Sequence, residues 1–289
     1  MNILTLDELF NGDVATEKLG VTIGNFDGVH LGHQSLLSQI KSNFRSKEIK
    51  LLVITFVPHP MKVLKAKTSF LIHSYNNRRK LLEKNGVDYL VEVDFTRDFS
   101  SLDAVSFLEN YLFKIKNLDS IYLGYDFAFG SNKQGGRNLV LNECKKRNID
   151  IEIQPEFKED NQLVSSSLIR NELEKGNVSR ANEFLGRAFT ITGMVVKGQG
   201  RGRQIGFPTA NISFFEDKKI PKGGVYITRT KYRDQDYYSV TNIGINPTFS
   251  DHSVLSVETH ILDFDNDIYG ESLEISFLKN LREEKKFQS

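Results

Sequence analysis

The sequence predicts an α/β domain with a parallel sheet, followed by a smaller domain built as an antiparallel β-barrel. Up to about residue 186, short apolar runs alternate with segments of helical period; after it, short strands bounded by turn residues follow with hardly any helix. The 289 residues suffice for two domains that each bury a core. We therefore expect domains at 1–186 and 187–289.

The first domain is expected to place helices on the faces of its sheet, because its predicted strands are separated by helical segments. Ligands of such sheets bind at the carboxyl ends of the strands, where segment 24–33 falls. The lysine-rich segment 62–67 is predicted to be a solvated loop. Strands are predicted at 21–23, 51–56, 89–93, 121–123 and 149–153, and helices near 31–45, 76–85, 102–115 and 136–147.

The second domain is expected to begin near Gly186-Arg187, after two short helices at 166–175 and 178–185. Gly, Pro, Asn or Asp bounds each apolar run that follows, which is typical of a small barrel. Its strands are predicted at 190–196, 224–231, 237–243, 254–261 and 273–277.

Charge and cysteine content exclude several classes of protein. Residues 1–186 contain 24 basic and 24 acidic side chains, and residues 187–289 contain 14 and 13. Neither part has the large positive charge of a protein that wraps nucleic acid. The single cysteine, Cys144, excludes an internal disulfide and fits a reducing compartment. The first residues do not resemble a secretion signal, and no apolar run is long enough for a membrane span, so we expect a soluble cytoplasmic protein.

Two imidazoles, His30 and His33, stand where the first long strand gives way to a helix. The first N–H groups of a helix lack internal partners and carry partial positive charge, so this junction suits phosphate. Residues three apart can share one face of the first turn, where both rings could stabilise charge on phosphorus. A pair at a helix start without any ligand is the alternative that the two histidines alone leave open.

Three more segments carry residue types that a nucleotide site needs. Pro58-His59-Pro60 forms a rigid loop after a strand, Gly124–Gly130 offers a carboxylate beside aromatic rings, and Ser165–Arg170 puts hydroxyls at a helix start. Taken singly, each could be a turn, core residues or a helix cap.

These segments and Gly24–His33 resemble, in order and spacing, the adenylyltransferase module of bacterial bifunctional riboflavin kinase/FAD synthetases. The resemblance covers essentially the whole chain. It implies a Rossmann-like nucleotidyltransferase fold that transfers AMP from ATP to FMN and releases pyrophosphate. Positioning and charge stabilisation suffice for this reaction, because the FMN phosphate is already a nucleophile.

The resemblance also implies roles for individual residues. His30 and His33 would be catalytic and stabilise the transferring phosphate, while Mg²⁺ bridging the phosphates would supply further charge. Ser167 stands where the family usually has threonine, so we expect a tuned contact. The nucleotide-binding set is Gly24, Phe26, Asp27, Gly28, Asp126, Ser166, Ser167 and Arg170, and the flavin-binding set is Pro58, Pro60 and Phe129.

A second site is predicted around the glycine-rich basic loop 198–206, whose backbone could approach phosphates. A flexible hairpin is the alternative for this loop. Thr209 and Asn211, two residues apart, share one face if extended and are hard oxygen ligands for Mg²⁺. The loop residues expected at the nucleotide are Gly200, Gly202 and Arg203.

Pro208-Thr209-Ala210-Asn211 resembles the signature of riboflavin kinases, and Val257-Glu258-Thr259-His260 resembles the family strand that holds the general base. The resemblance implies that Glu258 takes the proton of the ribityl 5′-hydroxyl during γ-phosphoryl transfer. It places Arg282 at the flavin. Family members usually continue beyond the position of Ser289 through a further helix, so we expect that helix to be absent.

The leading hypothesis is a bifunctional enzyme that makes FMN at the barrel and FAD at the parallel sheet, with riboflavin, FMN and ATP as ligands. The alternatives are a chain in which only adenylyl transfer is effective, and a flavin-binding regulatory protein that has lost turnover.

Overall fold

The computed structural model describes residues 1–44, 48–130, 134–198, 206–214, 217–246 and 254–284. The chain forms two compact units. Unit 1 comprises residues 1–68 and 75–164, and unit 2 comprises residues 69–74 and 165–289.

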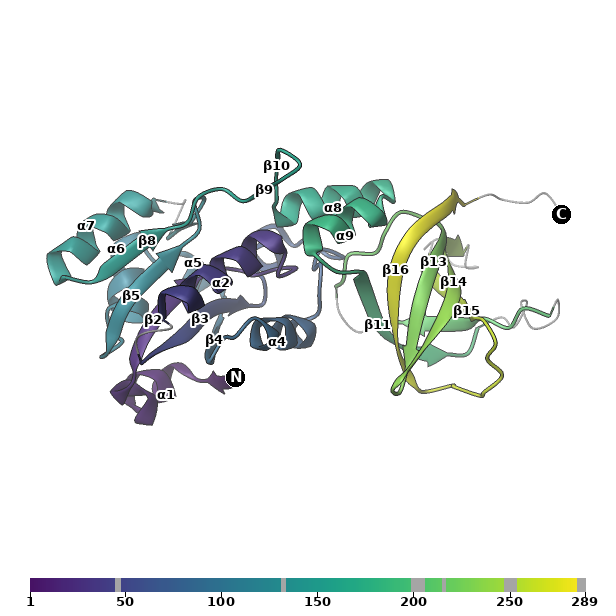
Figure 1. The fold of residues 1–289 in the computed structure, drawn as a ribbon, viewed down its shortest axis with the longest axis horizontal. Helices are drawn as coiled ribbons and strands as arrows, with labels where there is room; N and C mark the ends of the chain where they lie inside the picture. Colours follow the sequence, from purple (N-terminus) through teal and green to yellow (C-terminus); the bar gives the residue numbers. More distant parts are fainter. Residues whose placement is uncertain (45–47, 131–133, 199–205, 215–216, 247–253, 285–289) are drawn as a thin grey trace. The chain divides into compact units, whose positions relative to one another are not determined.

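A six-stranded sheet in the order β1-β4-β3-β2-β5-β8 forms the centre of unit 1 (Figure 1), and every neighbouring pair in it is parallel. The chain moves from β2 toward β3 and β4 and then crosses to β5 on the other side. The carboxyl ends of β2 and β5 therefore flank a topological switch point. The strands are β1 (Asn2–Leu4), β2 (Lys18–Ile23), β3 (Ile49–Val57), β4 (Tyr89–Asp94), β5 (Leu118–Leu123) and β8 (Asp150–Ile153).

Helices cover both faces of this sheet, because successive residues of the buried strands point to opposite sides. Leu52 and Ile54 of β3 pack with α1 (Leu6–Asn11) and α7 (Arg137–Arg147). Leu51 and Val53 pack with α2 (Leu31–Phe44) and α4 (Tyr75–Lys84). The predicted three-layer arrangement of the first domain is confirmed.

Two predictions of local structure in unit 1 are wrong. Most of segment 62–67 is helical, since α3 (Pro60–Lys65) begins with His59 as N-cap and Pro60 in its first turn. The helix expected over 102–115 is divided into α6 (Ala104–Phe107) and a π-helical turn (Leu108–Leu112), preceded by α5 (Arg97–Ser100).

Short elements complete unit 1. They are a 3₁₀ turn (Asp13–Thr16) and the two-residue strand pairs β6 (Ala128–Phe129) with β7 (Gly135–Gly136) and β9 (Lys158–Glu159) with β10 (Gln162–Leu163).

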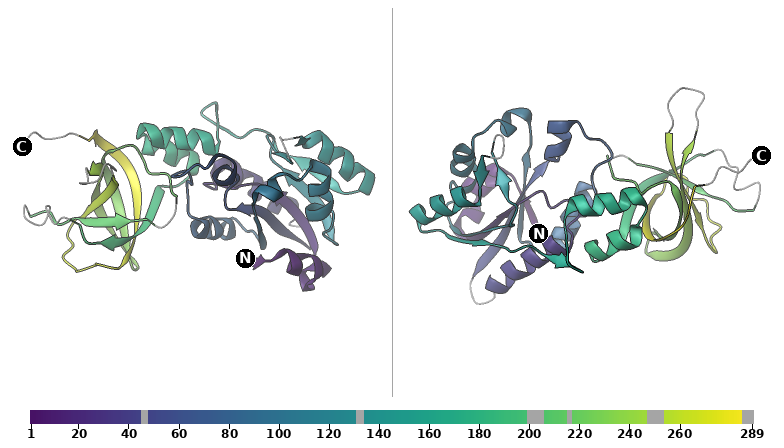
Figure 2. Two further views of the ribbon diagram at one scale, coloured as in Figure 1. Left: turned by 180° about the vertical axis from the view of Figure 1, so that it is seen from behind. Right: turned by 90° about the horizontal axis from the view of Figure 1, so that it is seen from above.

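The centre of unit 2 is a closed barrel in the strand order β11-β12-β15-β14-β13-β16, with antiparallel neighbours (Figure 2). Alternate residues along each strand are buried, as in β15, where Val257, Thr259 and Ile261 are buried. The barrel prediction is confirmed. The strands are β11 (Phe189–Val196), β12 (Ala210–Ser213), β13 (Gly224–Tyr232), β14 (Gln235–Asn246), β15 (Val254–Ile261) and β16 (Ser272–Glu283).

Unit 2 also contains α8 (Ser166–Lys175), α9 (Val178–Leu185) and segment 69–74. This segment meets the rest of unit 2 through a bridge between Leu71 and Lys218 and through His73, whose ring stacks near that of Phe189. In the described part of the chain, no helix has the length and apolar character required to cross a lipid bilayer.

Candidate active sites

The loop that follows β2 has an unusual backbone. Phe26, Gly28 and Val29 have φ angles of 47°, 86° and 37°, all in the left-handed region. A β-branched valine is rarely found there, so the surrounding contacts must hold this loop in place. The amide of Gly24 donates to the carbonyl of Ile54 at 3.1 Å, and both Phe26 and Asp27 are buried. Four predicted nucleotide residues thus belong to one constrained turn.

This turn delivers His30 and His33 to the start of α2. Their rings are stacked, with centroids 3.7 Å apart and planes 18° apart, and the His33 amide lies 3.4 Å from His30 Nδ1. His30 is buried and His33 is half-buried. A Cβ on Gly32 would lie 3.2 Å from two ring atoms of His30, so there is little space for a side chain at this position. The two imidazoles form one unit at the positive end of a helix dipole.

The predicted flavin loop follows β3, which is the neighbour of β2. Pro58 and Pro60 are half-buried and enclose the buried His59. His59 Nδ1 accepts from the Met61 amide at 3.1 Å, while the His59 amide donates to the Tyr75 hydroxyl at 2.9 Å. This loop is therefore held by its own side chain and by α4.

The loop after β5 places its carboxylate at the surface. Asp126 is exposed, and Tyr125 beside it has a raised pKa, chiefly through desolvation and then through the charges of Asp126 and Glu156. Phe129 is half-buried and packs against Phe107, with ring centroids 5.2 Å apart. Asp126 is thus open to a ligand, whereas one side of Phe129 belongs to the core.

The serine-rich segment begins α8, as predicted, but it belongs to unit 2. The Ser165 hydroxyl is the N-cap and accepts from the Leu168 amide at 3.2 Å, so Ser166 and Ser167 occupy the first turn. Arg170 Nε donates to the carbonyl of Phe70 at 3.0 Å, and its guanidinium carbon lies 3.6 Å from the centroid of the Phe70 ring. Contact of these residues with a triphosphate stays a prediction.

In the barrel, strand register brings together residues that are far apart in the sequence. Asn211 of β12 is directly opposite Glu258 of β15, and Glu258 is directly opposite Asn242 of β14. Directly opposite residues share one face of a sheet, and the buried neighbours Val257 and Thr259 show that this face lies outside the barrel. The half-buried amide, carboxylate and amide therefore form one polar rung across three strands.

The start of the glycine-rich loop lies against this rung. A Cβ on Gly198 would be 2.1 Å from Nδ2 of Asn211, so any larger residue would displace the amide. Thr209 is half-buried and precedes β12, and Arg282 is exposed on β16. The predicted nucleotide residues Gly200, Gly202 and Arg203 lie outside the described residues.

The donor set beside the rung fits Mg²⁺. Thr209 and Asn211 offer neutral hard oxygens two residues apart, and Glu258 is directly opposite Asn211. Magnesium prefers such oxygen ligands and usually keeps waters and phosphate oxygens among its other ligands. These residues could hold the ion together with a nucleotide.

Two residues near the sites were missed at the level of sequence. Asn242 needed the register of β14 and β15, which no local pattern supplies. Arg78 is buried on α4 one turn before the buried Leu82, so its place on the apolar face of that helix was a signal that could have identified it.

Comparisons with known proteins agree with this geometry. The sequence profile of the family described as FAD synthetase matches residues 13–168, and that of riboflavin kinase matches residues 185–289. The bifunctional riboflavin kinase/FMN adenylyltransferase of Listeria monocytogenes is 36% identical over 269 residues, covering 92% of this chain and 85% of that protein. The enzyme of the same name from Bacillus subtilis is 33% identical and covers 93% and 86%.

A crystal structure of a protein described as a macrolide-efflux protein from Streptococcus pneumoniae shares the fold, with a TM-score of 0.88 and 31% identity. It covers 100% of this chain and 94% of its own. The two profile matches and the curated relatives together cover nearly the whole sequence. The parallel sheet and the barrel lie in the regions that the two profiles match. The chain therefore belongs to the bifunctional riboflavin kinase/FMN adenylyltransferase family.

Proposed function

We propose that this protein phosphorylates riboflavin to FMN at the barrel and adenylylates FMN to FAD at the parallel sheet, with ATP as the donor in both reactions. The observation that carries the proposal furthest is the stacked pair of His30 and His33 at the start of α2, on the switch-point edge of the sheet. Functionally, we assign residues 1–186 to the adenylyltransferase and residues 187–289 to the kinase.

In adenylyl transfer, an oxygen of the FMN phosphate attacks the α-phosphorus of ATP, and pyrophosphate leaves. Negative charge grows on the transferring group and on the leaving group. We assign His30 and His33 to this charge, together with the free N–H groups at the start of α2. The constrained turn of Phe26, Gly28 and Val29 keeps them in place, so the barrier falls through positioning and electrostatics.

Binding of ATP and FMN in adenylyl transfer is assigned to the other residues of the family motifs. Gly24, Asp27 and Asp126 are assigned to the nucleotide with Ser166, Ser167 and Arg170, while Pro58, Pro60 and Phe129 are assigned to the flavin. The support is their place in the family motifs and, for the loops of unit 1, their position after adjacent parallel strands.

In the kinase reaction, the ribityl 5′-hydroxyl must lose a proton as it attacks the γ-phosphorus of ATP, and ADP leaves. We assign this proton to Glu258, whose carboxylate belongs to the polar rung with Asn211. Mg²⁺ bound with ATP would neutralise charge on the phosphates, and Thr209 and Asn211 are assigned to hold it. Gly200, Gly202 and Arg203 are assigned to the nucleotide and Arg282 to the flavin.

The proposal is tested by incubating the full chain with riboflavin, Mg²⁺ and ATP, and separately with FMN, Mg²⁺ and ATP, then separating flavins by chromatography. We expect FMN and FAD in the first reaction and FAD in the second. FAD from supplied FMN without any FMN from riboflavin would leave only the adenylyltransferase. Bound flavin without turnover in either reaction would identify a regulatory binding protein and overturn the proposal.

A further inference from the structure

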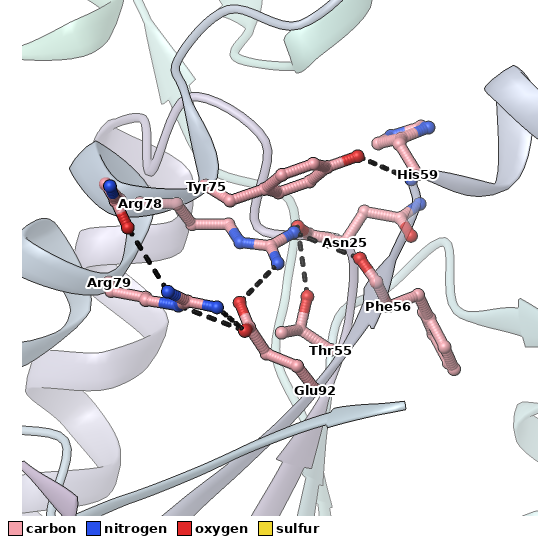
Figure 3. A network of polar contacts seen from close by, with 9 residues as sticks. Asn25, Thr55, Phe56, His59, Tyr75, Arg78, Arg79 and Glu92 are labelled. Carbon is pink, nitrogen blue, oxygen red and sulfur yellow. Dashed lines mark hydrogen bonds and ion pairs between the residues drawn. The ribbon is translucent and has the colours of Figure 1, made fainter. Parts of the chain in front are cut away.

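A buried arginine of α4 contacts the turn after β2 and the end of β3, which lead into the predicted adenylyl-transfer loops (Figure 3). Nη1 of Arg78 donates to the carbonyl of Asn25 at 3.1 Å and to the carbonyl of Phe56 at 3.3 Å. Its side chain is only 4% exposed. One guanidinium nitrogen thus joins the end of β3 to the turn that follows β2.

Each carbonyl stands one or two residues before a residue assigned to the reaction. Asn25 precedes Phe26, the first residue of the turn in the left-handed region, and the turn leads to His30. Phe56 stands two residues before Pro58, the first residue of the flavin loop. The Thr55 hydroxyl also donates to the Asn25 carbonyl, at 3.3 Å, so this oxygen is fixed from two sides.

The charge of Arg78 is balanced within the same network. Nη2 donates to Glu92 Oε1 at 2.9 Å, and the Glu92 side chain is 9% exposed. Arg79 contacts the other oxygen of this carboxylate, with Nε to Oε2 at 3.0 Å, from a side chain that is 36% exposed. Figure 3 draws both arginines: the two bonds to the carbonyls start from Arg78, and Arg79 lies against Glu92.

We propose that Arg78 is a positioning residue for adenylyl transfer, because its guanidinium holds the Asn25 and Phe56 carbonyls and thereby sets the position of the histidine pair relative to the flavin loop. Glu92 pairs with the guanidinium and keeps it aimed at these carbonyls. This inference rests on the proposed function of the site.

The physical reason is that the turn carries two non-glycine residues at positive φ, which cost free energy and need support from outside the loop. Nη1 of Arg78 supplies this support by donating to both carbonyls, and the buried position of the arginine strengthens these charge-assisted hydrogen bonds. Misplacement of a catalytic group by about 1 Å can cost about 10²-fold in rate.

The first test compares Arg78→Met with Arg79→Met in the full chain. Methionine fills the space of the arginine stem without donating hydrogen bonds. We expect Arg78→Met to lower kcat for FAD formation by about 10- to 100-fold, with KM for ATP changed by less than about threefold, since the lost interaction acts in the transition state. Arg79→Met removes a cation from the same carboxylate and leaves both bonds from Arg78 to the carbonyls in place, so it should keep kcat within about threefold.

Because Arg78→Met leaves a buried carboxylate with one cation fewer, a double variant separates positioning from folding. Arg78→Met/Glu92→Met removes both buried charges, which proteins often tolerate without loss of stability. Its kcat should remain about 10- to 100-fold low in folded protein. Arg78→Lys, which restores a cationic donor with three hydrogens, should recover most of the rate.

A second readout is the nitrogen spectrum of the six histidines in labelled, folded protein. The signals of His30 and His33 should shift in Arg78→Met and in the double variant, and should stay in place in Arg79→Met. Wild-type kcat in the double variant, or equal effects of Arg78→Met and Arg79→Met, would overturn the inference. Failure of the unmodified chain to form FAD would instead overturn the proposed function.

Discussion

Asn211 and Glu258 face each other across the antiparallel pair of β12 and β15, on the side of the strands that points away from the barrel interior. Residues that face each other in this way have Cβ atoms about 5 Å apart. Asn211 could therefore contact a phosphate-bound ion while Glu258 contacts the hydroxyl nucleophile beside it. The chain joins them through β13 and β14, and only the closure of the barrel makes them neighbours.

Replacing Glu258 by glutamine should remove the carboxylate that accepts the proton, while the side chain keeps nearly the same shape. We expect FMN formation from riboflavin to fall by at least about 10²-fold, which is the usual contribution of a general base. FAD formation from supplied FMN should stay within about twofold, and chromatography of both reactions measures the difference. Ser256→Ala, two residues away on the same face, is the matched control. Near-normal riboflavin phosphorylation by Glu258→Gln would remove the residue from this role.

Replacing Gly32 by alanine should separate stability from activity. Alanine in a helix stabilises by about 0.5–1 kcal/mol relative to glycine, but the new methyl group would lie 3.2 Å from the His30 ring. We expect the thermal midpoint to stay equal or rise, while FAD formation decreases by about tenfold because the imidazoles move.

Ser42→Ala, at an exposed position of the same helix, gives a comparable change in helix propensity far from the ring pair and should keep full activity. Equal activity in the two variants would show that the position of His30 has no influence on adenylyl transfer.

The barrel interior contains a chain of hydroxyl groups whose loss should be costly. Thr241 Oγ1 lies 2.8 Å from Thr228 Oγ1 and 2.9 Å from Thr259 Oγ1, and all three side chains are buried. Thr241→Val removes a partner of the Thr259 hydroxyl and one of the partners of the Thr228 hydroxyl, which keeps its bond to Ser239. The substitution should lower the free energy of unfolding by about 1–3 kcal/mol, measured by urea denaturation.

Thr192→Val is the control for this substitution. The Thr192 Oγ1 is buried and has no hydrogen-bond partner among the described residues, so its removal should be neutral or stabilising. A larger loss in Thr192→Val than in Thr241→Val would contradict the account of the hydroxyl chain.

Unit 2 should lose stability in mild acid because of His73. Burial, followed by the charges of Arg187 and Lys218, holds the His73 pKa well below 6.5. Arg187 Nη2 lies 2.7 Å from His73 Nε2, and burial lowers the Arg187 pKa to about 10. Below about pH 6.5, His73 binds a proton in the unfolded chain but stays neutral in the folded chain. The free energy of unfolding therefore falls as pH decreases below that value.

Hydrogen exchange of residues 69–74 and 189–196, compared at about pH 7.5 and about pH 5.5 after correction for intrinsic exchange rates, measures this effect. His73→Gln keeps a neutral hydrogen-bond acceptor and should remove most of the pH dependence. Unchanged pH dependence in this variant would assign the effect to another group.

Local patterns predict most of the strands, and also the change from alternating strands and helices to consecutive strands. Apolar runs such as 51–56 are long enough to identify buried strands, and Gly186 ends α9 in the left-handed conformation. Local patterns do not reveal α3, because Pro58-His59-Pro60 is also typical of a loop and the lysines that follow interrupt any apolar periodicity.

What the sequence by itself determined is the fold class, the two kinds of domain and the family, because periodicity, turn residues and motif spacing are local along the chain. Only the tertiary structure decided that Asn242 joins Asn211 and Glu258 in one rung, and that Arg78 supports the turn before His30. Both facts depend on strand register and on the packing of a helix against strand ends, which are set by contacts between residues far apart in the sequence.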